Sequence, residues 1–444
     1  MMDWKTLIST KRLGMEAYHV LESDGRSEFL RDYDRLVFSA PFRRLQNKTQ
    51  VFPLPGSVFV HNRLTHSLEV SCVGRSLGNK VSRMLTNKYP ELVDSLIEDI
   101  GCIVSAACLA HDLGNPPFGH SGERAISTYF SEGEGKKLKE HFTSEEWDDI
   151  IHFEGNANAF RLLVHQFKGR RHGGFALTYS TLASIVKYPY SSHYANGKPK
   201  FGFFQTEAET FRTIADELGL ICLSPAGAPL KYCRYPLVYL VEAADDICYQ
   251  LMDIEDAYKL KILTHKDTVD LLLSFVDDGY KCRIEEVFNM VTDKNEQIAY
   301  LRSKIIGILI DECAEAFVLH EKEILQGSFE GSLIKHITPR CKDAYKSCSE
   351  ISVQKIYRSR DVLDIELAGF RIINTLIELM VDATMHPEKA YSRLLIDRVS
   401  EQYDMYASTL YGKVQAVFDY LSGMTDVFAL DLYRKINGNS LPAI

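Results

Sequence analysis

The chain lacks the features that mark a membrane-spanning or secreted protein. No uninterrupted apolar run approaches the roughly 18 residues that can span a bilayer, and the N-terminus, Met-Met-Asp-Trp-Lys, has no apolar signal-peptide core. The ten cysteines form no CxxC pair and several lie in apolar helical patterns, which favours reduced thiols over disulfides or a zinc ribbon. These absences predict a cytoplasmic protein without a membrane partner.

An excess of positive charge is also missing. The formal net charge is −9 over 444 residues, which argues against a surface built throughout for nucleic acid and leaves room for a local basic pocket. With 45% hydrophobic and 25% charged residues, the composition is that of a globular chain that can bury a large core. Alternating strand patterns are nearly absent, whereas apolar residues recur at helical spacing along most of the chain. We therefore expect an all-α fold.

No internal repeat, low-complexity tract or shift in composition marks a domain boundary, so we expect one compact body. Residues 1–28 are predicted to be a polar, partly ordered lead-in, 29–262 a helical core, and 263–444 a mostly helical extension packed on that core. Tyrosines, glycines and prolines between 190 and 205 predict a loop or one small hairpin. Helices are expected over 62–85, 92–112, 119–130, 153–167, 181–188, 206–218, 236–261, 266–278, 283–291, 295–328, 360–383 and 410–421.

Residues 111–123, His-Asp-Leu-Gly-Asn-Pro-Pro-Phe-Gly-His-Ser-Gly-Glu, place two pairs of reactive side chains around a rigid turn. An apolar helical stripe runs into His111 and Asp112 and is then broken by glycine and two prolines. His120 and Glu123 follow three residues apart, so both can lie on one side of the first turn of the next helix. Ligand-type side chains at a helix end, followed by an acid/base pair, indicate a metal site with its catalyst beside it.

Two further ligand-type side chains, His66 and Asp245, lie on apolar helical stripes elsewhere. A carboxylate aimed into an apolar layer is costly unless it is paired or bound to a metal. Together with His111 and Asp112 they form a mixed nitrogen and oxygen set, which suits Mn²⁺, Fe²⁺, Co²⁺, Ni²⁺ or Mg²⁺. The absence of cysteine ligands disfavours structural zinc. A buried salt-bridge network without a metal is the alternative interpretation.

Two basic clusters offer a second kind of chemistry. Arginine presents a planar fork of donors that suits phosphate, although a solvated surface explains such clusters equally well. With nearby aromatic residues the clusters also fit a non-enzymatic alternative, a module that binds single-stranded nucleic acid. The clusters are Arg43, Arg44 and Lys48, beside Gln46 and Gln50, and then Lys168, Arg170 and Arg171.

The order His66, His111-Asp112, Asp245 matches the H…HD…D signature of the HD-domain metal-dependent phosphohydrolases. The flanking segments are more specific: FRRLQNKTQVFPL, NRLTHSLEV, HDLGNPPFGHSGE, FEGNANAFRLL and YLVEAADDICY. Together they resemble the bacterial deoxyguanosine-triphosphate triphosphohydrolases, a branch of the dNTP triphosphohydrolases. The resemblance runs discontinuously from about Arg31 to Asp256 and recurs more weakly at 365–371. It implies an HD-domain core over 29–262.

The resemblance implies that water attacks the α-phosphorus of dGTP, releasing deoxyguanosine and intact tripolyphosphate. One divalent metal ion per subunit is implied, Mn²⁺ or Mg²⁺ first, with Fe²⁺, Co²⁺ or Ni²⁺ as alternatives. His120 and Glu123 match the catalytic pair of the family. His120 would protonate the departing 5′-oxygen or relay a proton, and Glu123 would set its tautomer and charge.

The resemblance also implies how the substrate is held. Arg63 would grip the α-phosphate, and Lys187 and Tyr188 would reach the phosphate chain. Gln50 and Asp253 would bind the 3′-hydroxyl, and Glu366 would accept hydrogen bonds from guanine. Tyr249 would fill the space of a ribose 2′-hydroxyl, so that a ribonucleotide is rejected by clash and desolvation. The full set of implied contacts is Gln50, Val51, Arg63, Lys187, Tyr188, Tyr249, Asp253 and Glu366.

Asn115 stands where animal relatives carry a second histidine, and Asp246 also departs from some relatives; both favour the dGTP-specific branch. Other HD-type activities stay open, namely a broad dNTPase, a nucleotidase, or a phosphodiesterase acting on cyclic nucleotides or (p)ppGpp. The implied partners are dGTP or another dNTP, further copies of the chain in a homo-oligomer, often a hexamer, and single-stranded DNA as an effector.

Overall fold

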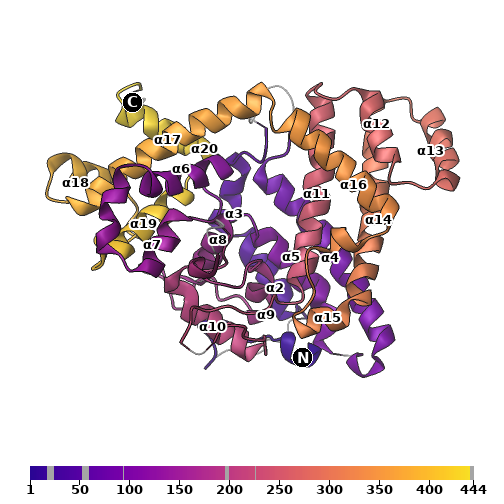
Figure 1. Cartoon of the computed structure of the whole chain (residues 1–444), viewed down its shortest axis with the longest axis horizontal. Coiled ribbons are helices and arrows are strands. Elements are labelled where there is room, and N and C mark those ends of the chain that lie inside the picture. The colour runs from indigo at the N-terminus through magenta and orange to yellow at the C-terminus, as the bar shows by residue number, and fades with distance from the viewer. Residues whose placement is uncertain (18–24, 53–59, 94, 196–199, 226, 441–444) are drawn as a thin grey trace.

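The computed structural model describes residues 1–17, 25–52, 60–93, 95–195, 200–225 and 227–440, and these ranges fold mainly into helices (Figure 1). Within them there are isolated β-bridges but no strand, which confirms the predicted all-α fold. None of these helices combines the length and apolar character needed to cross a membrane. The ten cysteines are free thiols.

The centre of the molecule is formed by α4 (Arg63–Lys88), α5 (Ile100–Ala110) and α11 (Val238–Lys259). Helix α5 is apolar on every side and almost completely buried, because α4, α11, α2 and α9 surround it. Helices α4 and α5 approach closely where glycines face each other: a Cβ on Gly78 would lie 2.7 Å from the Cα atom of Gly101. The start of α4, the end of α5 and the N-terminal half of α11 carry the predicted metal ligands.

The other helices are arranged around this centre (Figure 1). They are α1 (Trp4–Leu7), α2 (Glu28–Val37), α3 (Ala40–Arg44), α6 (His120–Ser131), α7 (Ser144–Ile151), α8 (Gly155–Val164), α9 (Tyr179–Ile185), α10 (Ala208–Glu217), α12 (His265–Leu273), α13 (Asp278–Met290), α14 (Lys294–Leu319), α15 (Glu321–Gln326), α16 (Pro339–Ile351), α17 (Arg360–Met385), α18 (Ala390–Asp397), α19 (Leu410–Ser422) and α20 (Asp426–Ile436). Short 3-10 turns are η1 (Leu45–Asn47), η2 (Pro90–Leu92), η3 (Leu96–Asp99), η4 (Glu134–His141), η5 (Ser192–Ala195), η6 (Gln205–Glu207) and η7 (Leu333–His336), and Ser352–Ile356 is a π-helical turn.

Buried apolar side chains gather into two cores. The larger one contains side chains of α4, α5 and α11, and its members come from the part of the chain between Met2 and Val362. The second is formed by α6 and α7 with α17, α19 and α20, which lie together in Figure 1. The segment 111–123 leaves α5 in the larger core and enters α6 in the second. The predicted catalytic stretch therefore lies at the junction of the two cores.

The first 17 residues are packed into the larger core and do not form the polar lead-in that we expected. The indole Nε1 of Trp4 donates to Oε1 of Glu321 at 2.7 Å. The guanidinium of Arg12 is fully buried and is paired with Glu28 and Asp32, each at 2.5 Å. Partners this distant in sequence cannot be recognised from local composition. The boundaries at 28 and 262 stay predictions.

Most expected helices are present with shifted ends, but several features differ. The helix expected over 92–112 begins as a 3-10 turn, and the one expected over 295–328 is two helices that meet at His320. The helices that were not expected are α1, α2, α3, α7, α16, α18 and α20. Their amphipathic patterns are short and rich in charge, so periodicity gave a weak signal.

The small hairpin expected between 190 and 205 is not formed in the described part of that segment. Ser191 makes an isolated parallel bridge with Phe203, and Tyr190 bridges to Lys231; a hairpin would pair antiparallel strands. Residues 196–199 lie outside the described ranges. Buried phenylalanines at 201, 203 and 204 anchor the segment, so it holds a fixed course without regular structure.

Candidate functional site

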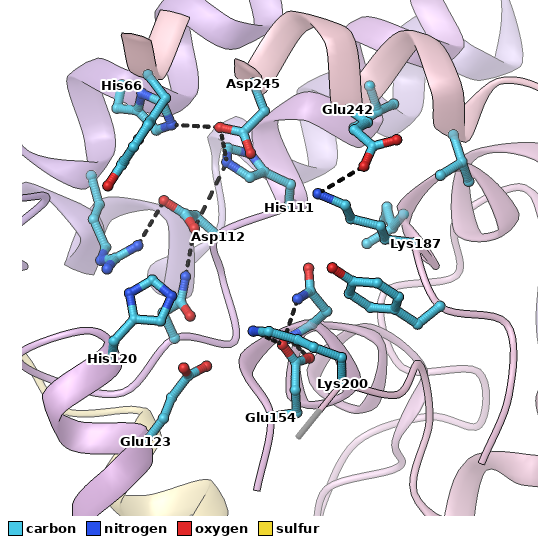
Figure 2. Close-up of a pocket in the computed structure, with 18 of the residues that line it drawn as sticks. His66, His111, Asp112, His120, Glu123, Glu154, Lys187, Lys200, Glu242 and Asp245 are labelled. Atoms are coloured by element: carbon cyan, nitrogen blue, oxygen red, sulfur yellow. Dashed lines mark hydrogen bonds and ion pairs between the residues drawn. The ribbon is translucent and has the colours of Figure 1, made fainter. Parts of the chain in front are cut away.

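A cavity lies beside the start of α4, the end of α5 and the N-terminal half of α11, and it contains most of the predicted site residues. Figure 2 shows His66, His111, Asp112 and Asp245 turned toward one another on one side of the cavity, with His120, Glu123, Glu154 and Lys200 on another. The cavity brings together Gln50, Arg63, His66, His111, Asp112, His120, Glu123, Lys187, Tyr188, Asp245 and Tyr249.

Local sequence features fix where these side chains stand. A capping box between Asn62 and Thr65 begins α4, so Arg63 and His66 fall in its first turn. Beyond α5, the chain passes so close to α8 that a Cβ on Gly114 would lie 2.1 Å from the backbone nitrogen of Ala159. No side chain fits there, and the turn is held tightly against its neighbour.

The predicted metal ligands lie within reach of a single ion. One ligand atom each from His66, His111 and Asp112 can be chosen so that all lie within 4.8 Å of one another. Oδ1 of Asp245 is 3.1 Å from Nε2 of His66 and 3.6 Å from Nε2 of His111. Imidazole and carboxylate donors at this spacing fit a divalent cation of the kind expected from the sequence.

The orientation of His111 supports the same fit. Its Nδ1 atom donates to the carbonyl oxygen of Cys108 at 2.6 Å, which fixes the tautomer and leaves the lone pair of Nε2 toward Asp112 and Asp245. A backbone partner on the second nitrogen is the usual arrangement for a ligating histidine.

The carboxylates of the cluster are kept ionised by their neighbours. Burial alone would raise the pKa of Asp112, but Nη1 of Arg63 lies 2.8 Å from its Oδ2 and lowers the pKa below its usual value. Burial likewise opposes ionisation of Asp245, and the facing imidazoles of His111 and His66 hold its pKa well below the usual range. Ionised carboxylates are the form that binds a cation.

His120 and Glu123 begin α6 and both line the cavity. Burial, with the positive charges of Arg63 and Lys200, lowers the pKa of His120, so the imidazole is neutral at neutral pH. Oε1 of Glu123 accepts from the backbone N–H of Gly155 at 2.8 Å, and no hydrogen bond joins it to His120 among the described residues. The role of Glu123 in setting the tautomer of His120 stays a prediction.

Two lysines bring positive charge to the cavity. Nζ of Lys187, predicted at the phosphate chain, lies 3.1 Å from Oε1 of Glu242. Nζ of Lys200 lies 2.7 Å from Oε1 of Glu154, whose other oxygen caps the N-terminus of α8. Sequence reasoning missed both Lys200 and Glu154. Lys200 lies in a segment without helical periodicity. For Glu154, the one signal was its position in the FEGNANAFRLL segment.

A second cavity continues from the first. Gln50, His120, Glu123, Lys200 and Tyr249 line both of them. The second cavity adds the predicted contacts Val51 and Glu366, together with Thr49, Phe118, Ile151, Phe153, Tyr357, Val362 and Ile365. Oε1 of Glu366 pairs with Nη2 of Arg124 at 3.1 Å, and both side chains are largely exposed.

Asp253 lines neither cavity and lies behind Tyr357 instead. Its Oδ2 accepts from the hydroxyl of Tyr357 at 2.6 Å, and burial raises its pKa to about 8. The rings of Tyr357 and Tyr249 are 6.1 Å apart. Sequence reasoning missed Tyr357; the π-helical turn that places it just before α17 has no recognisable pattern.

Lys48 is not a phosphate contact, contrary to one interpretation of its cluster. Its ammonium is buried and donates to the carbonyl oxygens of Asn115 at 2.6 Å and Ser422 at 2.7 Å. Burial lowers the pKa of Lys48 to about 7. The side chain ties the turn at Asn115 to the end of α19. Arg43 and the cluster of Lys168, Arg170 and Arg171 are exposed.

The chain matches two known domain families and several relatives along almost its whole length. Residues 63–170 match the HD domain, and residues 336–435 match a phosphohydrolase-associated domain. A deoxyguanosinetriphosphate triphosphohydrolase-like protein of Pseudomonas aeruginosa is 37% identical over 455 residues, covering all of both chains. One from Synechocystis is 38% identical over 99% of this chain and 100% of its own. The deoxyguanosinetriphosphate triphosphohydrolase of Yersinia enterocolitica is 30% identical over 98% and 99%.

Proposed function

Because the chain belongs to the deoxyguanosinetriphosphate triphosphohydrolase family of HD-domain proteins, we propose that it hydrolyses dGTP to deoxyguanosine and tripolyphosphate. The observation that carries the proposal is the continuity of the two cavities across His120 and Tyr249. A triphosphate in the first cavity and a nucleoside in the second would place the bond between them beside His120. A water molecule would attack the α-phosphorus of the bound dGTP.

His66, His111, Asp112 and Asp245 would hold one divalent cation, with Mn²⁺ or Mg²⁺ as the expected ions. When bound, such an ion supplies Lewis-acid stabilisation of phosphate charge and makes water more acidic. Arg63 and Lys187 would bind phosphate oxygens, because their charges line the same cavity as the ligands. These contacts orient the triphosphate relative to His120.

His120 would supply the proton that the departing 5′-oxygen takes. In the free protein the lowered pKa keeps the imidazole neutral. Negative charge from a bound triphosphate favours the protonated form, so substrate binding itself would load the proton. Glu123, beside it on α6, would stabilise the charged imidazole through space.

Preference for dGTP would come from the second cavity. Tyr249 would occupy the space beside C2′. Gln50 would bind the 3′-hydroxyl, since its buried Oε1 has no hydrogen-bond partner among the described residues. Glu366 would accept from guanine after leaving Arg124. A broad specificity for dNTPs is the alternative, and the solvent exposure of the pair of Glu366 and Arg124 favours it. A cytoplasmic location, a homo-oligomer and single-stranded DNA as effector stay predictions.

The test is to incubate the Mn²⁺-loaded protein with each dNTP and with GTP separately, and to identify products by chromatography. The proposal predicts deoxyguanosine from dGTP, slower release of nucleoside from other dNTPs and little from GTP. Release of dGMP or of a diphosphate would refute the proposed reaction. Equal rates with all four dNTPs would be consistent with the proposed reaction but would refute the preference for guanine.

A further inference from the structure

One carboxylate in the cavity wall is shared by two cations. Oε1 of Glu242 lies 3.1 Å from Nζ of Lys187, and Oε2 of Glu242 lies 2.7 Å from Nη2 of Arg234. The three side chains are 27%, 11% and 21% exposed for Lys187, Glu242 and Arg234, so the chain of charges is largely shielded from water. Figure 2 shows the ammonium of Lys187 directed at Glu242.

The shared carboxylate stands where an anionic substrate would bind. Glu242 precedes Asp245 by three residues on α11, so the two carboxylates lie on one side of the helix. Lys187 and Glu242 line the catalytic cavity and also a neighbouring one, which Arg234 lines as well. Arg234 does not line the catalytic cavity, and its direct contact with the wall of that cavity is the pair with Glu242.

An anion in a phosphate pocket lowers the affinity of that pocket for phosphate, and the effect is large where burial reduces screening. A phosphate oxygen that binds Lys187 must compete with Glu242 for the same ammonium. Arg234 weakens this competition because its guanidinium also attracts the carboxylate of Glu242, at the oxygen that is not paired with Lys187. The guanidinium is itself held in place over the ring of Tyr239, 4.4 Å from the centroid, and by the carbonyl oxygen of Gly331.

We propose that Glu242 is a positioning residue that competes with phosphate oxygens for Lys187 and so promotes release of the tripolyphosphate product, while Arg234 sets the strength of that competition. The inference rests on the proposed function, because it assigns Lys187 to the phosphate chain. It explains why a pocket for a highly charged anion contains Glu242, a carboxylate that is not one of the predicted metal ligands.

The test is direct binding of inorganic tripolyphosphate to the Mn²⁺-loaded protein, measured by calorimetry. Glu242→Gln removes the competing charge, and we expect tripolyphosphate to bind about tenfold more tightly. Arg234→Gln releases Glu242 to Lys187, and we expect binding about threefold to tenfold weaker. Opposite signs for two neighbours are not expected from loss of packing, which would weaken binding in both variants.

Kinetics and a double substitution supply the second readout. Glu242→Gln should lower KM and kcat together when product release limits turnover. In a Lys187→Gln background, Glu242→Gln should change the affinity by less than half of its effect in the wild-type protein. Glu217→Gln is the matched control, since it removes the same charge from a lysine pair at 2.8 Å, with Lys11, outside either cavity.

Unchanged or weaker binding by Glu242→Gln in a variant that retains its melting temperature and metal would overturn the inference. Absence of tripolyphosphate binding to the wild-type protein would overturn it as well. Because binding is measured without turnover, failure of the proposed reaction is seen separately. In that case dGTP would yield no tripolyphosphate, while the variants would still differ in binding it.

Discussion

Nη1 of Arg63 lies 2.8 Å from Oδ2 of Asp112, so the arginine predicted to grip phosphate also holds a predicted metal ligand. The pair joins the first turn of α4 to the end of α5. Arg63 thereby lowers the pKa of Asp112 against the effect of burial. We therefore expect metal binding and phosphate binding to be coupled through this contact.

Replacing Arg63 with glutamine should affect both functions. A partner of a metal ligand typically contributes about 10–100-fold to metal affinity or activity, and loss of a charged phosphate contact adds to that. We expect kcat/KM for dGTP to fall about 100-fold or more, with weaker Mn²⁺ binding in calorimetry. Arg212→Gln, which removes an exposed pair with Glu209, should change neither. Normal metal affinity in the Arg63 variant would refute the coupling.

His111→Ala and Asp245→Ala should each abolish metal retention, because each removes a donor from the cluster. Metal content after dialysis, measured by atomic spectrometry, checks this. His193→Ala is the control: His193 is exposed, pairs with Asp148 and lies outside the cavity. Stoichiometric metal and full turnover in either ligand variant would rule out the assigned site.

His120→Gln should separate chemistry from binding. The side chain lines the cavity without hydrogen bonds to the metal cluster among the described residues, so metal content and KM should change little. Loss of a general acid costs about 10²–10⁴-fold in rate. Single-turnover measurements should show this loss in kcat. If the folded variant instead lost its metal, the division of roles between His120 and the ligands would be wrong.

Tyr249→Ala should relax discrimination against the 2′-hydroxyl. The ring lines both cavities, and its removal opens the space in which we place C2′. We expect the ratio of kcat/KM for dGTP over GTP to fall by about tenfold or more, as measured by competition between the two nucleotides. A proportional loss for both substrates would show that Tyr249 contributes to binding but not to sugar selectivity.

Asp149 should make the stability of the fold depend on pH. Its carboxylate accepts from Ser192 at 2.6 Å, from the backbone of Gln205 at 2.8 Å and from Tyr411 at 2.5 Å, and so joins α7 to the segment that carries Lys200. Burial raises the pKa of Asp149 from 3.8 to about 7. The folded state therefore binds more protons than the unfolded state between these values.

It follows that the stabilising contribution of Asp149 is complete below about pH 4 and is lost as the pH rises through about 7. Asn at this position cannot ionise. Relative to Asp149→Asn, the free energy of unfolding of the wild-type protein should fall by roughly 2–4 kcal/mol over that range. Urea denaturation at several pH values measures the difference, and parallel curves for the two proteins would contradict it.

The sequence was sufficient for the helices that carry the site, because their apolar stripes are long and regular. His66, His111, Asp112 and Asp245 all lie at or near such stripes, and the structure places them together. His120 and Glu123 follow from the rigid turn after α5. Their chemical roles stay predictions, since geometry shows proximity and not turnover.

Other parts of the site depend on contacts between distant segments and leave no local pattern. Lys48 looks like a surface cation in sequence, but its partner Ser422 is 374 residues away. Lys200 and Tyr357 reach the cavities from segments without helical spacing. Asp253 was expected at the sugar, and only the fold shows Tyr357 standing in front of it. Such placements follow from tertiary packing.

The central claim is water attack at the α-phosphorus of dGTP, and hydrolysis in ¹⁸O-labelled water tests it most directly. Products would be separated and examined by mass spectrometry and ³¹P NMR. The account predicts one ¹⁸O atom in a terminal phosphate of intact tripolyphosphate and none in deoxyguanosine. Label in the 5′-hydroxyl of deoxyguanosine, or in pyrophosphate or orthophosphate released directly from dGTP, would contradict it.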